Sequence, residues 1–308
     1  MRLRHIYTIC LTLIATGCTD SIEKLDPEHT IWFDKPASIW EETLPLGNGR
    51  LGMMPDGGID HERIVLNEIS LWSGCEADYS NPDAAESLPQ IRDLLLQGKN
   101  AEAQEVMYRR FVPHKPTDGG TYGSYQTLGE LTITHHNAQN NISGYRRWLD
   151  LRDATAYTEF TMGVTTYTRR YHVDRKADVM VVEVSADRNG MVGLKANLYR
   201  PWNAVTEILE DGLVKMSGEM DSGVEGVQGV RYSAYMRLIA DGKDAAISAD
   251  SVCRADKAWI IVSAATSFFE GEGYDARARE LLDKAVLCRQ EKMYRRSVKA
   301  HKELYDRV

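Results

Sequence analysis

The chain has 308 residues, of which 43% are hydrophobic and 27% charged, and it carries a net charge of −8. The composition is ordinary for a globular protein, and the length allows a sizeable core in about two domains. The acidic balance excludes a general affinity for nucleic acid or anionic membranes. After the first residues, no apolar run is long enough for a transmembrane helix.

Residues 1–17 predict a bacterial lipoprotein signal peptide. Arg2 and Arg4 precede the short apolar segment 6–15, and small residues then lead to Cys18. We expect cleavage before Cys18 and lipidation of this residue, so that an exported protein is held at a periplasmic or cell-surface membrane only by its lipid anchor. The alternative is an ordinary secretory signal, with Cys18 incidental. Residues 18–30 then form a polar tether.

Residues 44–52 predict a tight turn held by apolar side chains. Three glycines and a proline fall within this segment, Leu-Pro-Leu-Gly-Asn-Gly-Arg-Leu-Gly, and three leucines lie between them. A regular strand does not tolerate so much glycine, and a flexible linker does not carry so many leucines. We therefore expect strands and turns here, with a close approach of the backbone to a neighbour.

A small helical insertion is predicted after residue 80. Asn81-Pro82-Asp83 opens the first helix, whose apolar residues recur at helical spacing at Leu88, Ile91 and Leu95, and Gly98 ends it. Asn100 is the expected cap of a second helix, which ends before Pro113. We expect this insertion to pack on a sheet.

From residue 128 onward the pattern is that of β-structure. Residues 154–162 and 164–173 are rich in threonine and aromatics and are separated by Gly163, which is typical of a hairpin. Asp211-Gly212 indicates a two-residue turn. Further short strands are expected at 131–134, 179–184, 194–198, 232–239 and 259–264. The fold predicted for residues 31–270 is therefore mainly β, a large antiparallel β-sandwich of the super-sandwich kind.

The last segment, 275–308, is predicted to be helical. Asp275 is the expected cap of its first helix. The second carries an apolar stripe formed by Tyr294, Val298, His301, Tyr305 and Val308. Such a stripe needs a packing partner. Since the sequence stops on it, we expect a linker cut short before a second domain.

A series of motifs follows in order along the chain, at residues 32–37, 40–42, 44–52, 66–68, 71–74, 125–131, 145–151, 164–169 and 301–308. Taken together, they resemble the N-terminal domain of glycoside hydrolase family 95, which comprises exo-acting α-L-fucosidases and some enzymes that act on α-L-galactosides. The resemblance implies a β-sandwich joined by a helical linker to an (α/α)6 barrel. In that family the barrel holds a glutamic acid, an aspartate base and assisting asparagines, and hydrolysis inverts the anomeric centre.

The resemblance implies that this chain supports the barrel of an enzyme that removes terminal fucose from oligosaccharides or glycans. Its partners would be that barrel in cis and, through the intact enzyme, a fucosylated glycan. The chain alone would be inactive, since the catalytic motifs are absent from it. Two alternatives remain open: a non-catalytic carbohydrate-binding surface lipoprotein, and the remnant of a broken gene.

No catalytic residue, cofactor or metal site is assigned within this chain. Adjacent Glu41 and Glu42 are a poor acid–base pair if they lie on a strand, because their side chains then point to opposite faces. The segment 47–50 lacks the ending of a phosphate-binding loop. A close contact with the barrel is the preferred interpretation. The candidate interface or sugar-proximal residues are Asn48, Arg50, Asn67, Glu68, Trp72 and Trp202.

Other chemically distinctive residues receive structural interpretations. His114, His135 and His136 lack the accompanying ligands of a metal site and are expected at the surface or at an interface. Cys75, Cys253 and Cys288 allow one disulfide, but buried free thiols are preferred. Most of the six tryptophans are expected in the core, with one or two exposed for sugar stacking.

Overall fold

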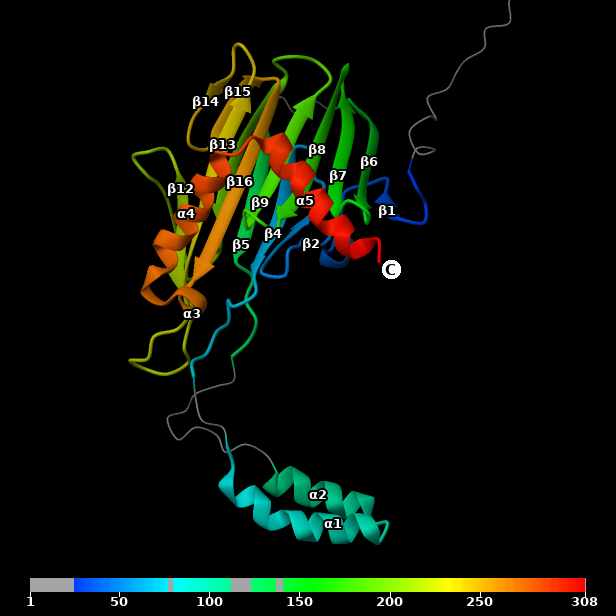
Figure 1. The fold of residues 1–308 in the computed structure, drawn as a ribbon, viewed down its shortest axis with the longest axis vertical. Helices are drawn as coiled ribbons and strands as arrows, with labels where there is room; N and C mark the ends of the chain where they lie inside the picture. The colour runs from blue at the N-terminus through cyan, green and yellow to red at the C-terminus, as the bar shows by residue number, and fades with distance from the viewer. Residues whose placement is uncertain (1–24, 77–79, 112–122, 137–140, 308) are drawn as a thin grey trace, which may run out of the picture.

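Two antiparallel sheets pack face to face in the computed structural model, which describes residues 25–76, 80–111, 123–136 and 141–307 (Figure 1). The signal segment, Cys18, His114 and Val308 lie outside these residues. The described strands form a nine-stranded sheet, β1-β6-β7-β8-β9-β16-β13-β12-β11, and a seven-stranded sheet, β14-β15-β10-β5-β4-β3-β2. The predicted fold class, a large antiparallel sandwich, is confirmed.

The nine-stranded sheet consists of β1 Thr30–Phe33, β6 Ile142–Asp150, β7 Thr155–Met162, β8 Thr165–Asp174, β9 Val179–Ala186, β16 Lys257–Thr266, β13 Arg231–Asp241, β12 Val214–Glu219 and β11 Val205–Ile208. The seven-stranded sheet consists of β14 Ala246–Ile247, β15 Ser251–Ala255, β10 Val192–Tyr199, β5 Gly129–His135, β4 His61–Glu68, β3 Leu51–Pro55 and β2 Leu46–Gly47. The main core lies between the two sheets.

The central strands of the nine-stranded sheet are apolar on both faces. In β9, Met180 and Val182 point into the core between the sheets, whereas Val179 and Val181 belong to a second cluster under the C-terminal helices. A strand covered on both sides needs no polar alternation, and this explains the continuous β-branched run in the sequence.

Three helices follow the last strand: α3 Ser267–Glu270, α4 Tyr274–Val286 and α5 Gln290–Tyr305, with a 3-10 turn η4 at Gly271–Gly273. Helix α4 covers the outer face of β13 and β16 (Figure 1). Asp275 does not cap it, because the helix begins one residue earlier, after Gly273. The Asp275 carboxylate accepts hydrogen bonds from Ser233 Oγ and Tyr235 OH instead, at 2.7 and 2.9 Å.

The stripe on α5 is not unpartnered, which corrects the expectation from the sequence. Tyr294 is buried, and its hydroxyl lies 3.0 Å from Tyr157 OH of β7. His301 Nε2 donates to the Leu151 carbonyl at 2.8 Å, and Tyr305 OH lies 2.8 Å from His29 Nδ1. The sandwich itself is the packing partner, so the stripe gives no reason to infer a further domain.

The helical insertion consists of the 3-10 segment η3 Pro82–Ser87, α1 Leu88–Leu96 and α2 Asn100–Arg110. The two α-helices pack on each other and stand clear of the sheets (Figure 1), so the prediction that they pack on a sheet is wrong. Asn81 caps η3 by accepting from Asp83 N, whereas Asn100 is already helical and Lys99 precedes it.

The predicted hairpin at Gly163 is confirmed, since β7 and β8 pair antiparallel and Gly163 has a φ of +64°. The Asp211-Gly212 turn is wider than two residues. Ile208 pairs with Val214, and Leu209 N donates to Leu213 O at 2.8 Å within the loop.

Candidate functional site

The turn between β2 and β3 brings Asn48 and Arg50 to one end of the sandwich. Leu44, Leu46 and Leu51 are buried beneath it. Asn48 Oδ1 accepts from the backbone N–H groups of Arg50 and Leu51 at 2.9 and 2.8 Å. Gly49 has a φ of +101°, a backbone conformation that residues other than glycine rarely adopt. The predicted turn held by leucines is confirmed.

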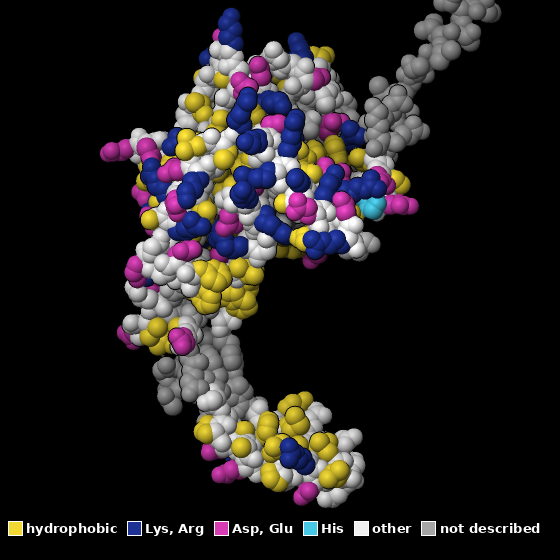
Figure 2. Space-filling view, viewed as in Figure 1, with side chains coloured by type: hydrophobic (Ala, Val, Ile, Leu, Met, Phe, Trp, Pro, Cys, Tyr) yellow, Lys and Arg dark blue, Asp and Glu magenta, His cyan; other side chains and the backbone are white. Residues whose placement is uncertain are grey.

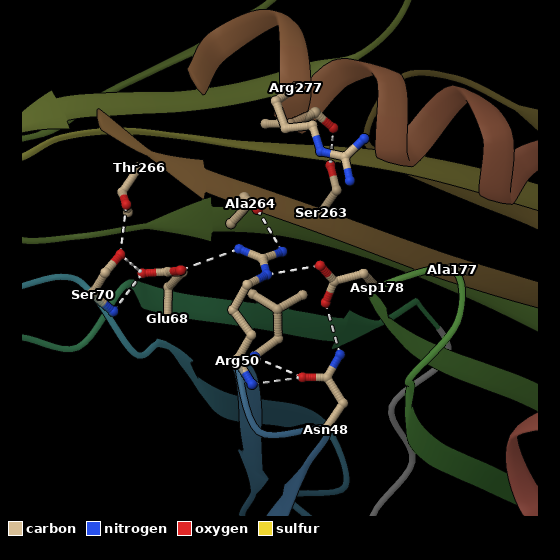
Figure 3. Close-up of polar contacts among 12 residues, drawn as sticks. Asn48, Arg50, Glu68, Ser70, Ala177, Asp178, Ser263, Ala264, Thr266 and Arg277 are labelled. Atoms are coloured by element: carbon tan, nitrogen blue, oxygen red, sulfur yellow. Dashed lines mark hydrogen bonds and ion pairs between the residues drawn. The ribbon is translucent and has the colours of Figure 1, made fainter. Parts of the chain in front are cut away.

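Arg50 joins the two sheets (Figure 3). Its Nε donates to Asp178 Oδ2 at 2.7 Å, Nη1 to Glu68 Oε1 at 3.1 Å and Nη2 to the Ala264 carbonyl at 2.9 Å. Glu68 ends β4 of the seven-stranded sheet, whereas Ala264 lies on β16 and Asp178 just before β9 of the nine-stranded sheet. All three guanidinium nitrogens are therefore used within the domain.

The other polar groups of this network also form hydrogen bonds with groups of the same domain. Glu68 is fully buried, and its Oε2 accepts from Ser70 N at 2.8 Å and from Ser70 Oγ at 2.5 Å. Ser70 Oγ also lies 2.5 Å from Thr266 Oγ1 of β16. Asn48 Nδ2 donates to Asp178 Oδ1 at 2.7 Å. The network thus ties together the sheet ends and leaves its two carboxylates bound to Arg50.

Two hollows lie beside the network and share Phe269. The smaller, about 380 Å³, is lined on one side by charged residues, including Arg50, Asp178 and Arg277, and also by Phe269 and Leu281. The larger, about 670 Å³, is lined mainly by apolar side chains, including Trp72 and Phe268. The structure therefore places a charged hollow next to an apolar one at this end of the sandwich.

The six candidate residues are distributed unevenly around these hollows. Asn48, Arg50 and Glu68 meet in the network, and Trp72 lines the apolar hollow. Asn67 lies outside the network, and its Oδ1 is buried with no hydrogen-bond partner among the described residues. Trp202 is exposed on a different loop, where its carbonyl accepts from Arg200 Nε.

Trp72 sits edge-on to Tyr125, with ring centroids 5.4 Å apart, and the two residues also form an isolated β-bridge. Burial and the nearby Glu68 carboxylate raise the pKa of Tyr125 above its usual value. The pair joins the segment that leads into the helical insertion to the segment that leads out of it.

The Glu41–Glu42 pair is not on a strand, contrary to the premise used above. Both residues lie in the 3-10 turn η2, Trp40–Glu42. The Glu42 carboxylate accepts from the backbone N–H and the hydroxyl of Ser38 at 2.8 and 3.0 Å. These bonds favour the ionised form and lower the pKa of Glu42, which suits a local structural role.

Three further expectations are corrected. His135, the last residue of β5, is buried rather than at the surface, whereas His136, the first residue after the strand, is exposed. The three cysteines are free but only half-buried. None of the six tryptophans is fully buried: Trp32, Trp40, Trp72 and Trp202 are exposed, and Trp148 and Trp259 are half-buried. Within the described ranges, no cluster of three or more potential metal ligands is present.

Sequence reasoning missed Asp178, Thr266, Phe268, Phe269 and Arg277. Asp178 gives no sequence signal, since its role depends on a left-handed backbone, φ +57°, that aims it at Arg50. Phe268 and Phe269 gave no signal of exposure either, because phenylalanine is among the residues most often buried.

The fold and the site together define a class of protein: a large antiparallel β-sandwich domain with a structural arginine network at one end. A sequence model described as "Glycosyl hydrolase family 65, N-terminal domain" matches residues 31–271. The chain belongs to this family and is an N-terminal domain of a glycoside hydrolase. The family match does not single out family 95.

Two relatives are named as fucosidases. The chain is 29% identical over 267 residues to "Probable alpha-fucosidase A" of Aspergillus niger, covering 81% of this chain and 32% of that protein. It is 29% identical over 167 residues to "Alpha-L-fucosidase 2" of Arabidopsis thaliana, covering 54% of this chain and 19% of that protein. The chain thus spans a third or less of the length of these relatives.

Among solved structures, a "Putative kojibiose phosphorylase from human microbiome" matches with a TM-score of 0.52 and 12% identity, over 90% of this chain and 38% of that one. At this identity the likeness supports the fold alone. No helix in the described part of the chain is long and apolar enough to cross a membrane.

Proposed function

We propose that this chain is the N-terminal β-sandwich of an α-L-fucosidase-like glycoside hydrolase, exo-acting and inverting, whose catalytic groups belong to a helical barrel that follows it. The observation that carries the proposal is the match to the Aspergillus niger fucosidase, which spans 81% of this chain but only 32% of that protein. The motif series that resembles family 95 supports the same assignment.

In this proposal the sandwich supports the barrel and does not carry out hydrolysis. Inversion needs an acid and a base about 6.5–9.5 Å apart, with a water between the base and the sugar. Glu68 is fully buried, and both it and Asp178 are held by the Arg50 guanidinium. These two carboxylates therefore cannot serve as that pair. Because the resemblance to family 95 implies that the acid and base belong to the barrel, we expect no turnover by residues 18–308 alone.

The test compares the complete gene product with residues 18–308, using an α-L-fucosyl oligosaccharide as substrate. We expect the complete product to release fucose with the β-anomer appearing first by proton NMR, and the shorter chain to match a blank. Hydrolysis by residues 18–308 overturns the proposal, as does a complete product that binds glycans saturably without cleaving them. The second outcome would favour the carbohydrate-binding lipoprotein.

We also propose export with a lipid anchor at Cys18. The support is the order of charged, apolar and small residues before Cys18. Metabolic labelling with a palmitate analogue should mark the wild type and not Cys18→Ser. Equal labelling of both proteins would contradict the proposal.

A further inference from the structure

An exposed apolar patch lies at the end of the sandwich where β16 runs into α3. We define it as Ile69, Trp72, Phe268 and Phe269, which are 50%, 47%, 67% and 58% exposed. All four line the hollow of about 670 Å³. Figure 2 shows hydrophobic side chains gathered beside α3 on this face. Apolar side chains that cluster in this way around a hollow indicate an interaction surface.

The polar groups around the patch favour a protein partner over a sugar. A sugar site needs hydrogen-bonding groups aimed into it. Here Trp72 Nε1 donates to the Ile69 carbonyl at 3.2 Å, and the Ser70 hydroxyl is held between Glu68 and Thr266. Glu76 is a charged residue in the lining of the larger hollow, whereas Arg50, Asp178, Glu270 and Arg277 stand to one side, in the smaller hollow next to Phe269. An apolar centre with a charged border is the usual anatomy of a protein interface.

The position of the patch relates it to the end of the chain. Strands β6 and β16 run in the same direction, since three antiparallel strand pairings fall within β6-β7-β8-β9 and one more joins β9 to β16. Their carboxyl ends, Asp150 and Thr266, therefore lie at the same end of the sheet. The last turns of α5 dock there at Leu151, and α3 begins there after Thr266 (Figure 1).

We propose that this patch is the docking surface for an apolar helix face of the catalytic domain in cis, an inference that rests on the proposed function. The Aspergillus niger relative has about two thirds of its length outside the match, since the chain covers 32% of it. A domain of that size that starts from the last turn of α5 meets the patch at the same end of the sandwich. Phe268 and Phe269 then insert between helices of that domain.

Hydroxyl-radical footprinting read by mass spectrometry tests the docking. Ile69 in the patch and Ile247 on the edge strand β14 are matched probes, 50% and 52% exposed. In the complete gene product we expect Ile69 to be labelled roughly fivefold more slowly than in residues 18–308, because interface cores pack like protein interiors. Ile247 should be labelled equally in both proteins.

A pair of variants of the complete product sharpens this test. Phe268→Asp should restore the fast labelling of Ile69, whereas Val164→Asp should not. Val164 is 77% exposed on the turn between β7 and β8, at the opposite end of the sandwich. The Val164 variant therefore controls for the added charge.

The outcomes separate the two proposals. Fucoside hydrolysis with Ile69 labelled as fast as in residues 18–308 overturns the docking and leaves the proposed function standing. Protection of Ile69 by a helical domain that does not act on fucosides supports the docking and overturns the proposed function. If Ile69 becomes protected in residues 18–308 alone as their concentration rises, the patch binds a second copy of the chain. That result overturns the docking in cis. A complete product that ends at residue 308 overturns both.

Discussion

Replacing Arg50 with methionine removes the link between the two sheets and keeps most of the side-chain volume. The Arg50 side chain is 24% exposed, whereas its partner Glu68 is fully buried. In Arg50→Met, Glu68 keeps its two hydrogen bonds from Ser70 but loses the positive charge beside it, and the Ala264 carbonyl loses its donor. Removing one partner of a buried ion pair costs about 3–5 kcal/mol, and the exposure of Arg50 favours the lower end, about 3 kcal/mol.

Arg63→Met is the matched control. Arg63 pairs with Glu130 at 2.7 Å, a shorter contact than that between Arg50 and Glu68, but its side chain is 57% exposed. A pair so open to water is worth about 0–1 kcal/mol. If burial and not the contact distance sets the energy, the two variants should differ by about 2 kcal/mol or more.

Urea unfolding followed by tryptophan fluorescence measures both variants. A double-mutant cycle with Glu68→Gln then isolates the coupling, because the neutral amide no longer needs a counter-charge. We expect the double variant to be more stable than the sum of the single effects by about 2 kcal/mol. Equal midpoints for Arg50→Met and Arg63→Met would refute the reasoning that the network holds the sheets together through a buried charge.

Three further predictions follow from other parts of the fold. Burial first, and the Arg170 charge second, lower the pKa of His172 to about 3 from 6.5, so its contribution is complete above pH 6.5 and is lost as the pH falls toward 3. Between pH 7 and 4.5, the free energy of unfolding of His172→Phe should therefore fall by about 2.5 kcal/mol less than that of the wild type, measured by urea titrations at both pH values. A Cβ on Gly58 would lie 2.0 Å from a backbone oxygen, whereas one on Gly273 meets nothing within 4 Å. Gly58→Ala should lower the thermal midpoint and Gly273→Ala should not, and equal midpoints would contradict the geometry. Tyr294→Ala should cost about 3–5 kcal/mol in urea unfolding, because this buried ring anchors α5. Arg295→Ala, its exposed neighbour, should stay within about 0.5 kcal/mol, and a similar loss in both would mean that α5 is not docked.

The alternation of apolar and polar residues predicts most of the strands, because it depends only on neighbouring residues of the sequence. The Thr-rich runs around Gly163 and the turn at residues 44–52 were found because their side-chain alternation and glycine positions specify local backbone geometry. The position of the helical insertion, clear of the sheets, could not be predicted in this way. An amphipathic pattern shows that a helix has an apolar side, but not which element covers it.

The candidate site shows the same limit. Asn48, Arg50 and Glu68 come from one short stretch of sequence, and their grouping could be anticipated. Asp178 and Thr266, the partners from the other sheet, are 128 and 196 residues away from the Arg50 and Ser70 side chains that they contact. A pairing over such a separation is set by the register of the two sheets, which no local pattern specifies.

The α5 stripe and the apolar patch both differ from what the sequence suggests. Tyr294 and His301 indicated an unfinished domain, yet both are satisfied by the sandwich. Phe268 and Phe269 drew no attention and remain exposed beside a hollow. The case for a following catalytic domain therefore rests on the length of the fucosidase relatives and on the motifs that resemble family 95. If the patch proves to be solvated in the complete protein, the docking proposal fails and that case is unchanged.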